Sequence, residues 1–150
     1  GDMKILPLVL FALIALPFSS CSTAPKKVID RTPTPYPKKT EPKVLATYHG
    51  LASWYSIKTN FGTKTASGRR LYDHAHTAAH KTLPMGSKVR VTSLYNGKTA
   101  TLTITDRGPY IKGRIIDVTI GTAKRMGWYG RGITKVKVEL LKRGNWKYKH

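Results

Sequence analysis

The chain has 150 residues, with 27 Lys and Arg against 7 Asp and Glu, so its formal net charge is +20. A hydrophobic fraction of 40% excludes a wholly disordered chain. A single cysteine excludes an intramolecular disulfide framework and a zinc site with several cysteine ligands. The charge predicts an anionic partner, which leaves nucleic acids, anionic lipids and acidic wall polymers as classes.

An apolar run from Ile5 to Phe18 follows a lysine near the N-terminus. It is short for a membrane-spanning helix and is typical of a secretory signal peptide. The run ends in Phe18-Ser19-Ser20-Cys21, which resembles a bacterial lipobox, although Phe18 replaces the usual leucine. We therefore predict a signal peptide over residues 1–21 and lipidation of Cys21, the alternative being a plain cleaved signal.

The residue after the cysteine, Ser22, favours sorting to the outer membrane by analogy with Gram-negative lipoproteins. We therefore expect an exported chain, held by its lipid at the periplasmic face of that membrane. Residues 22–49 contain five prolines among lysines and threonines, which predicts a flexible, extended linker.

The sequence pattern changes at about Gly50, where short apolar runs begin to alternate with glycine-containing turns. This pattern predicts strands near Leu51–Tyr55, Lys88–Leu94, Thr99–Thr105, Arg114–Val118 and Lys135–Leu141. Asn96-Gly97 predicts a hairpin, and Thr119 is a candidate N-cap for a helix over Ile120–Met126. A short helical turn is also expected near Thr77–Lys81. Residues 50–142 therefore read as a mainly β domain, for which a closed barrel is the natural architecture, and residues 143–150 as a basic tail.

Four stretches share a resemblance to one family. They are Gly50-Leu51-Ala52-Ser53-Trp54-Tyr55, Thr77-Ala78-Ala79-His80-Lys81-Thr82-Leu83-Pro84, Thr105-Asp106-Arg107-Gly108-Pro109-Tyr110 and Gly113-Arg114-Ile115-Ile116-Asp117. Together they resemble the rare lipoprotein A family of septal peptidoglycan lytic transglycosylases. The resemblance implies a six-stranded double-psi β-barrel with one or two short helices, as in expansins. It also implies peptidoglycan glycan strands as substrate, no cofactor, and partners among cell-division or wall-remodelling proteins.

The family places three residues at its site, and two of them carry over to this sequence as His80 and Asp106. The third, a Glu after a Thr-Ala-x-Gly turn, falls on Arg69, and the spacing from Gly68 to His80 needs no gap. A lytic transglycosylase breaks the MurNAc–GlcNAc bond without water and leaves a 1,6-anhydro end. One carboxyl can act first as the acid and then as the base. Asp106 is our candidate for this role, the alternative being a turn-forming aspartate.

Residues 50–150 contain only four carboxylates, so each is weighed. Asp73 is a candidate substitute carboxyl at the substrate, with a solvated loop aspartate as the alternative. Asp117 is expected to be structural, pairing with Arg107 or capping backbone N–H groups near Ile120. Glu139 is expected to be an exposed strand residue.

The histidine His80 is expected to orient Asp106 or to contact the sugar, and the alternative is a packed structural residue. His80 has the i, i+4 spacing from His76 that two metal ligands on a helix would have. A metal needs more clustered ligands, so we expect no metal site. Arg69 beside Asp106 would favour the ionised carboxyl and weaken acid catalysis. It could instead bind an anionic group, such as the MurNAc lactyl carboxylate or a stem peptide.

Further substrate contacts are predicted from side chains in or beside the motifs. Aromatic rings stack on sugars, although core packing is an equal alternative. The predicted contacts are Trp54, Tyr55, Thr65, Arg107 and Tyr110.

Two other functions compete with cleavage. An expansin-like module that binds or loosens the wall without cutting it is favoured by Arg69. Nucleic-acid binding is suggested by the charge and by aromatic residues in Lys142–His150, but an exported lipoprotein rarely meets nucleic acid.

Overall fold

The structure is a computed structural model that describes residues 14–15, 17–20, 22–25 and 38–147. Contacts divide the chain into residues 1–39 and 40–150. The described part of the first unit has no helix or strand, and the predicted lipidation site, Cys21, lies outside the described residues. Among the described helices, none is long and apolar enough to cross a membrane.

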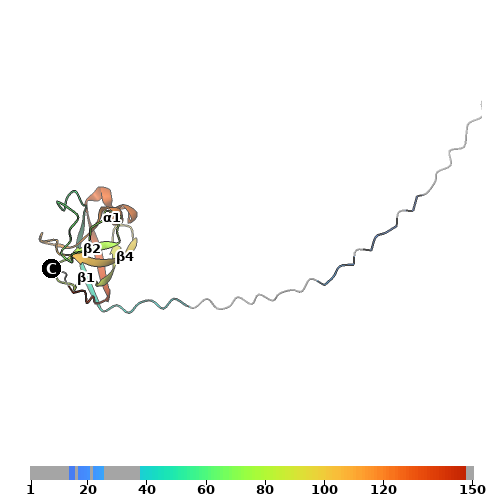
Figure 1. Cartoon of the computed structure of the whole chain (residues 1–150), viewed down its shortest axis with the longest axis horizontal. Coiled ribbons are helices and arrows are strands. Elements are labelled where there is room, and N and C mark those ends of the chain that lie inside the picture. The colour runs from blue at the N-terminus through green and yellow to red at the C-terminus, as the bar shows by residue number, and fades with distance from the viewer. Residues whose placement is uncertain (1–13, 16, 21, 26–37, 148–150) are drawn as a thin grey trace, which may run out of the picture. The chain divides into compact units, whose positions relative to one another are not determined.

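The second unit contains a closed barrel of six strands in the order β1-β5-β2-β4-β3-β6. Figure 1 labels three of these strands and the helix. The strands are β1 (Ala46–Tyr55), β2 (Thr77–His80), β3 (Lys88–Ser93), β4 (Thr99–Asp106), β5 (Arg114–Thr119) and β6 (Ile133–Lys142). Two pairs, β1–β5 and β2–β4, are parallel, and the other four are antiparallel. The predicted six-stranded closed barrel is therefore confirmed. Its first strand begins upstream of Gly50, because Ala46–His49 continue the pairing with β6.

The segment predicted as a helical turn, Thr77–Lys81, contains strand β2 (Thr77–His80) instead, so that prediction is wrong. β2 lies between β4 and β5, and its two alanines, Ala78 and Ala79, are 0% and 3% exposed. Because both faces of the strand are covered, its sequence lacks the polar–apolar alternation that marks a half-buried strand.

The predicted helix and hairpin are confirmed. The helix α1 (Ile120–Arg125) begins after Thr119, whose hydroxyl oxygen accepts a hydrogen bond from the Thr122 N–H, and a 3-10 turn, η1 (Tyr129–Arg131), follows it. The β3–β4 hairpin turns through Gly97, whose φ of +73° lies in the region that glycine favours.

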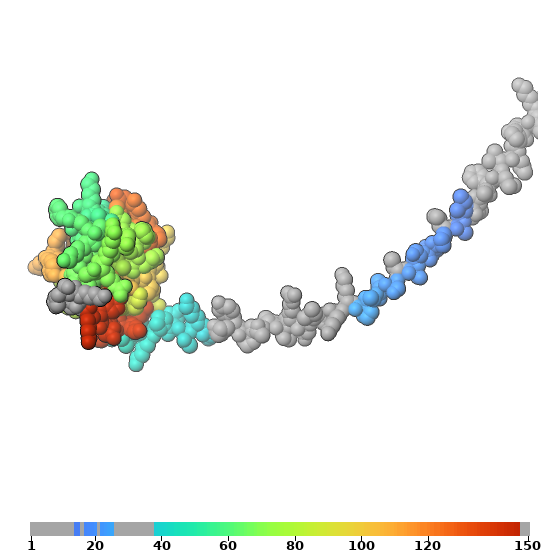
Figure 2. All heavy atoms as spheres, in the orientation of Figure 1, coloured from blue at the N-terminus to red at the C-terminus, as the bar shows by residue number. Residues whose placement is uncertain are grey.

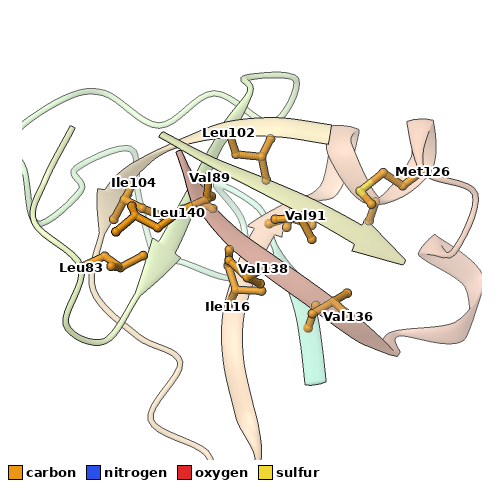
Figure 3. Packing of buried hydrophobic residues seen from close by; sticks show 14 of the residues in the cluster. Leu83, Val89, Val91, Leu102, Ile104, Ile116, Met126, Val136, Val138 and Leu140 are labelled. Carbon is orange, nitrogen blue, oxygen red and sulfur yellow. The ribbon is translucent and has the colours of Figure 1, made fainter. Parts of the chain in front are cut away.

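The core fills the inside of the barrel with alternate residues of each strand. Figure 3 shows their side chains converging between the strands. The group includes Val89, Val91, Leu102, Ile104, Ile116, Val118, Val136, Val138 and Leu140, all 0% exposed. Since successive side chains of a strand point to opposite faces, residues between these core positions point away from the core. The candidate site is built on that outer face.

Candidate active site

Two carboxylates flank the short strand β2. Ala79 is paired with Asp106 of β4 on one side and with Asp117 of β5 on the other. Neighbouring strands lie about 4.8 Å apart, so the α-carbons of the two aspartates are roughly 10 Å apart across β2. The fold therefore brings together two acids that are separated in the sequence.

A β-bulge in β4 sets the direction of Asp106. The register pairs Ala78 with Ile104 but Ala79 with Asp106, so Thr105 is the extra residue. Without the bulge, strand alternation would turn residue 106 to the same side as the core residue Ile104. The bulge instead puts Asp106 on the same face as Ala79 and Asp117.

The carboxylate of Asp106 is 9% exposed and is held by the backbone. Its Oδ1 accepts hydrogen bonds from the Ala66 N–H at 2.9 Å and from the Arg107 N–H at 2.8 Å. These two bonds fix the orientation of the carboxyl group at the end of β4. The Ala66 bond also ties the turn that precedes Arg69 to the site.

The second carboxyl, Asp117, accepts a hydrogen bond from the Ser53 hydroxyl of β1. Burial raises the pKa of Asp117 above its ordinary value; the Ser53 bond and Arg114 oppose this rise, and the charge of Asp106 adds to it. The expectation that Asp117 caps the helix is wrong, because the N-cap is Thr119. The raised pKa favours the protonated form of Asp117 more than in an exposed aspartate.

The hydroxyl of Tyr55 is buried, and side-chain hydrogen bonds with Thr105 and Thr77 act to lower the pKa of the phenol. Burial raises the pKa of Tyr55, and the negative charge of Asp106 raises it further, followed by that of Asp117. The group therefore stays protonated near the two carboxylates.

The imidazole of His80 is 6% exposed, and its Nδ1 accepts hydrogen bonds from the backbone N–H groups of Thr82 and Leu83, at 3.2 and 3.1 Å. Two donors at Nδ1 assign the proton of the neutral ring to Nε2. Burial, followed by the charges of Arg107 and Lys81, lowers the pKa of His80 to about 4. His80 is therefore neutral near pH 7.

The guanidinium of Arg107 lies against the same loop. It donates hydrogen bonds to the carbonyl oxygens of His80, at 3.1 Å, and Leu83, at 2.8 Å. Its backbone N–H meanwhile contacts Asp106. Arg107 thus connects the His80 loop to the Asp106 turn, and the three motif residues His80, Asp106 and Arg107 form one hydrogen-bonded unit.

The arginine at the family's glutamate position, Arg69, lies over the ring of Trp146, 3.7 Å from its centroid. The ion pairs among the described residues do not include one between Arg69 and Asp106. The carbonyl of Arg69 accepts hydrogen bonds from the N–H and hydroxyl of Thr65, which is 4% exposed. This turn fixes where the arginine side chain leaves the backbone.

The remaining side chains predicted to contact the substrate differ in how exposed they are. Asp73 accepts the Ile57 N–H at 2.7 Å through its carboxylate and so closes a loop. Trp54 packs against Tyr129, with ring centroids 4.9 Å apart, and Tyr110 is 77% exposed. In the described residues, no three His, Cys, Asp or Glu side chains gather closely enough to hold a metal ion.

Three residues that take part in this arrangement were not singled out by the sequence for these roles. Ser53 contacts Asp117, Tyr48 packs against His80 with centroids 5.8 Å apart, and Trp146 supports Arg69. Alternation along β1 would have put Ser53 on the outer face. The sequence has no signal for the contact between Trp146 and Arg69. Glu139, expected to be exposed, is 8% exposed and ion-paired with Arg90.

The fold and the motif residues define a double-psi β-barrel domain, and comparison with known proteins agrees. The family model described as "Lytic transglycolase" matches residues 47–138. The chain belongs to this family, which confirms the family predicted from the four motifs.

The relatives that the chain resembles include two proteins named endolytic peptidoglycan transglycosylase RlpA. The one from Pasteurella multocida is 49% identical over 92 residues, covering 61% of this chain and 31% of the relative. The one from Pseudomonas aeruginosa is 44% identical over 97 residues, covering 65% and 28%. The chain thus spans about three tenths of the length of these curated relatives.

A solved structure supports the fold alone. The apo expansin of Clavibacter michiganensis superposes with a TM-score of 0.52 at 17% sequence identity, covering 67% of this chain and 52% of the expansin. At this identity the likeness is to the barrel architecture.

Proposed function

We propose that the protein is an endolytic peptidoglycan lytic transglycosylase that cleaves MurNAc–GlcNAc bonds and leaves 1,6-anhydroMurNAc ends. The observation that carries the proposal is the row Asp106–Ala79–Asp117, which sets two carboxyls across one strand. Membership of the lytic transglycolase family and the names of the two relatives support the same reaction.

Asp106 is the catalytic carboxyl in this proposal, and Asp117 extends the single-carboxyl mechanism expected from the sequence. Asp117, whose pKa is raised, donates its proton to the glycosidic oxygen as the bond from C1 breaks. Asp106, oriented by two backbone N–H groups, takes the proton of the C6 hydroxyl as O6 bonds to C1. A proton returned from Asp106 to Asp117 through solvent resets the site, and no water is consumed.

The other residues of the site position the catalytic carboxyl or the substrate. His80 and Arg107 hold the loop and the turn on which Asp106 depends. The exposed ring of Tyr110 provides a surface for a sugar ring, with Trp54 packed on Tyr129 as a second aromatic contact, and no step requires a cofactor.

The decisive experiment is a digest of purified sacculi by the purified chain, with mass spectrometry of the products in ¹⁸O-labelled water. We expect 1,6-anhydro ends without label. Asp106→Asn and Asp117→Asn should each reduce the product by several powers of ten, while Glu139→Gln, a carboxylate on β6 outside the site, should retain it. Activity that survives Asp117→Asn but not Asp106→Asn would restore the single-carboxyl mechanism.

The second candidate is an expansin-like module that binds or loosens peptidoglycan without cutting it. Arg69, in place of the family's glutamate, favours it. Binding of the wild-type chain to sacculi with no anhydro product, from either intact or peptide-stripped glycan, would establish this candidate and exclude the transglycosylase.

We also propose export, with lipidation at Cys21 and attachment at the periplasmic face of the outer membrane. The lipobox-like segment and the basic domain, which suits an anionic wall polymer, support this location. Metabolic labelling with a palmitate analogue, with Cys21→Ala as the control, tests it. Proteins of cell division or wall remodelling are the proposed partners, and crosslinking in dividing cells tests for them.

A further inference from the structure

A surface pocket of about 460 Å³ lies beside the turn that supports Asp106. Its lining residues are Ser67, Gly68, Arg69, Trp146 and Lys147. Ala66, which donates to Asp106, immediately precedes this lining, and the Ser67 N–H donates to the carbonyl of Thr105. A ligand in the pocket would therefore lie within a few residues of the catalytic carboxyl.

One wall of the pocket is built by the end of the described chain, which Figure 2 shows in red on the surface of the barrel. The Trp146 N–H donates to the Met85 carbonyl at 3.3 Å, and the Gly144 N–H donates to the Ser87 hydroxyl at 2.9 Å. The indole lies so close to Gly86 that a Cβ there would come within 2.5 Å of its Nε1. The wall is thus held in place before any ligand arrives.

The other wall is Arg69, whose guanidinium stacks on the indole of Trp146. Stacking covers one face of the guanidinium. Its in-plane N–H groups, which bind a carboxylate in bidentate fashion, stay available to a ligand. No ion pair joins Arg69 to a carboxylate in the described part of the chain. Lys147 adds a second positive charge to the same lining, which contains no acidic residue.

We propose that this pocket is a subsite for a carboxylate on the 3-O-lactyl arm of MurNAc. The inference rests on the proposed function, since it names the part of the glycan substrate that the pocket receives. The carboxylate has two sources: the free lactyl group of peptide-stripped glycan, or a stem peptide attached to that group. Arg69 then determines specificity. It replaces the family's negatively charged glutamate with a positive side chain that binds a negatively charged group of the substrate.

Equilibrium binding to the full chain carrying Asp106→Asn tests the proposal with uncut ligands. The ligands are a GlcNAc–MurNAc tetrasaccharide with free lactyl groups, the same compound with lactyl amides, the same compound with stem tetrapeptides, and neutral chitotetraose. Arg69→Gln should weaken binding of a carboxylate ligand about tenfold. Binding of the lactyl amide and of chitotetraose should be unchanged.

The chain offers a matched control in Arg131, which stacks on Tyr95 at 4.2 Å and lies outside this pocket. Arg131→Gln removes the same charge and the same kind of stacking, so it should leave all four affinities unchanged. Arg69→Lys, which keeps the charge but loses the planar fork, should recover only part of the affinity. Circular dichroism confirms that each variant is folded.

Each outcome decides the proposal. A loss by Arg69→Gln confined to the free-lactyl ligand, or to the peptide ligand, supports the subsite and identifies its source. Equal losses in Arg69→Gln and Arg131→Gln, equal losses for charged and neutral ligands, or no loss would overturn it. The proposed activity fails separately: Arg69-dependent binding without anhydro product excludes cleavage only, and cleavage with Arg69-independent binding excludes the subsite only.

Discussion

The backbone N–H of Ala66 donates a 2.9 Å hydrogen bond to Oδ1 of Asp106, which lies forty residues further along the chain. The turn that begins at Thr65 therefore has two functions. It orients Asp106, the proposed catalytic carboxyl, on one side and presents Arg69 on the other. Changes within this turn should affect both the reaction and the binding of charged substrate.

Substitution of Thr65 by valine tests that dependence. The buried hydroxyl contacts the Arg69 carbonyl and the Ser67 hydroxyl, so its loss should lower the free energy of unfolding by about 1–2 kcal/mol. Because the turn also holds Asp106, kcat should fall more than the stability loss explains at a temperature where the variant is folded. Chemical denaturation and steady-state product formation measure the two effects. Unchanged kcat would contradict the coupling.

Substitution of Ser53 by alanine should shift the pH dependence of cleavage. The Ser53 hydroxyl donates to Asp117 and lowers its pKa, so its removal raises a pKa that burial already holds high. If Asp117 is the proton donor, activity declines as it ionises, and the alkaline limb of the kcat profile should move to higher pH. A shift of the acid limb alone would identify Asp117 as a base instead.

The neutral, buried His80 predicts a pH dependence of stability. Its pKa falls from 6.5 to about 4 on folding, so between these values the unfolded chain binds more protons than the folded chain. Stability from this group is fully present above about pH 6.5 and declines as the pH falls toward about 4. His80→Asn, whose side-chain oxygen can still accept from Thr82 and Leu83, should show a flatter profile in urea unfolding. An equally steep profile would assign the effect to other groups.

The ion pair between Arg90 and Glu139 joins β3 to β6 at 2.9 Å. The hydrogen bond from Arg90 holds the pKa of Glu139 below its ordinary value. The carboxylate therefore contributes stability above its unfolded pKa and loses that contribution as the pH falls through its folded pKa. Glu139→Gln should unfold less steeply with acid than the wild type. Thermal melts between pH 2 and 6 measure this, and parallel curves would contradict it.

Substitution of Gly86 by alanine tests the wall of the Arg69 pocket. The new Cβ would meet the Trp146 indole, and the φ of +85° is unfavourable for alanine. Trp146 should leave its place and become accessible to acrylamide quenching, while the β-barrel stays folded. Gly97→Ala, at a similar φ but with open space around the Cβ, is the control for backbone strain. Equal quenching in both variants would show that Trp146 is not held by Gly86.

The sequence predicted those parts of the molecule that local pattern encodes. Short apolar runs between glycine-containing turns predicted β3 and β6, and Thr119 predicted the start of α1. β2 was not predicted as a strand because its alanines are buried on both faces, which leaves no polar–apolar alternation in the sequence.

The candidate site was predictable only in part, for a related reason. Asp106 and His80 stand in recognisable motifs, but the nearness of Asp117 arises from strand order and from the bulge at Thr105. Pairing across a barrel is a long-range property that no short window of sequence contains. The contact between Arg69 and Trp146 joins two turns of unrelated sequence and is equally invisible.

Strand β2 has one further consequence. Asp106 and Asp117 are paired with Ala79 from opposite sides of β2. Each acid therefore lies one strand spacing from β2, and the sheet sets the distance between them. Loops around the barrel can lengthen, shorten or change sequence without altering this spacing. A slip of β2 by one residue would break the alignment of both acids at once. The geometry of the proposed reaction is thus set by the sheet, and the loops are free to vary with the substrate.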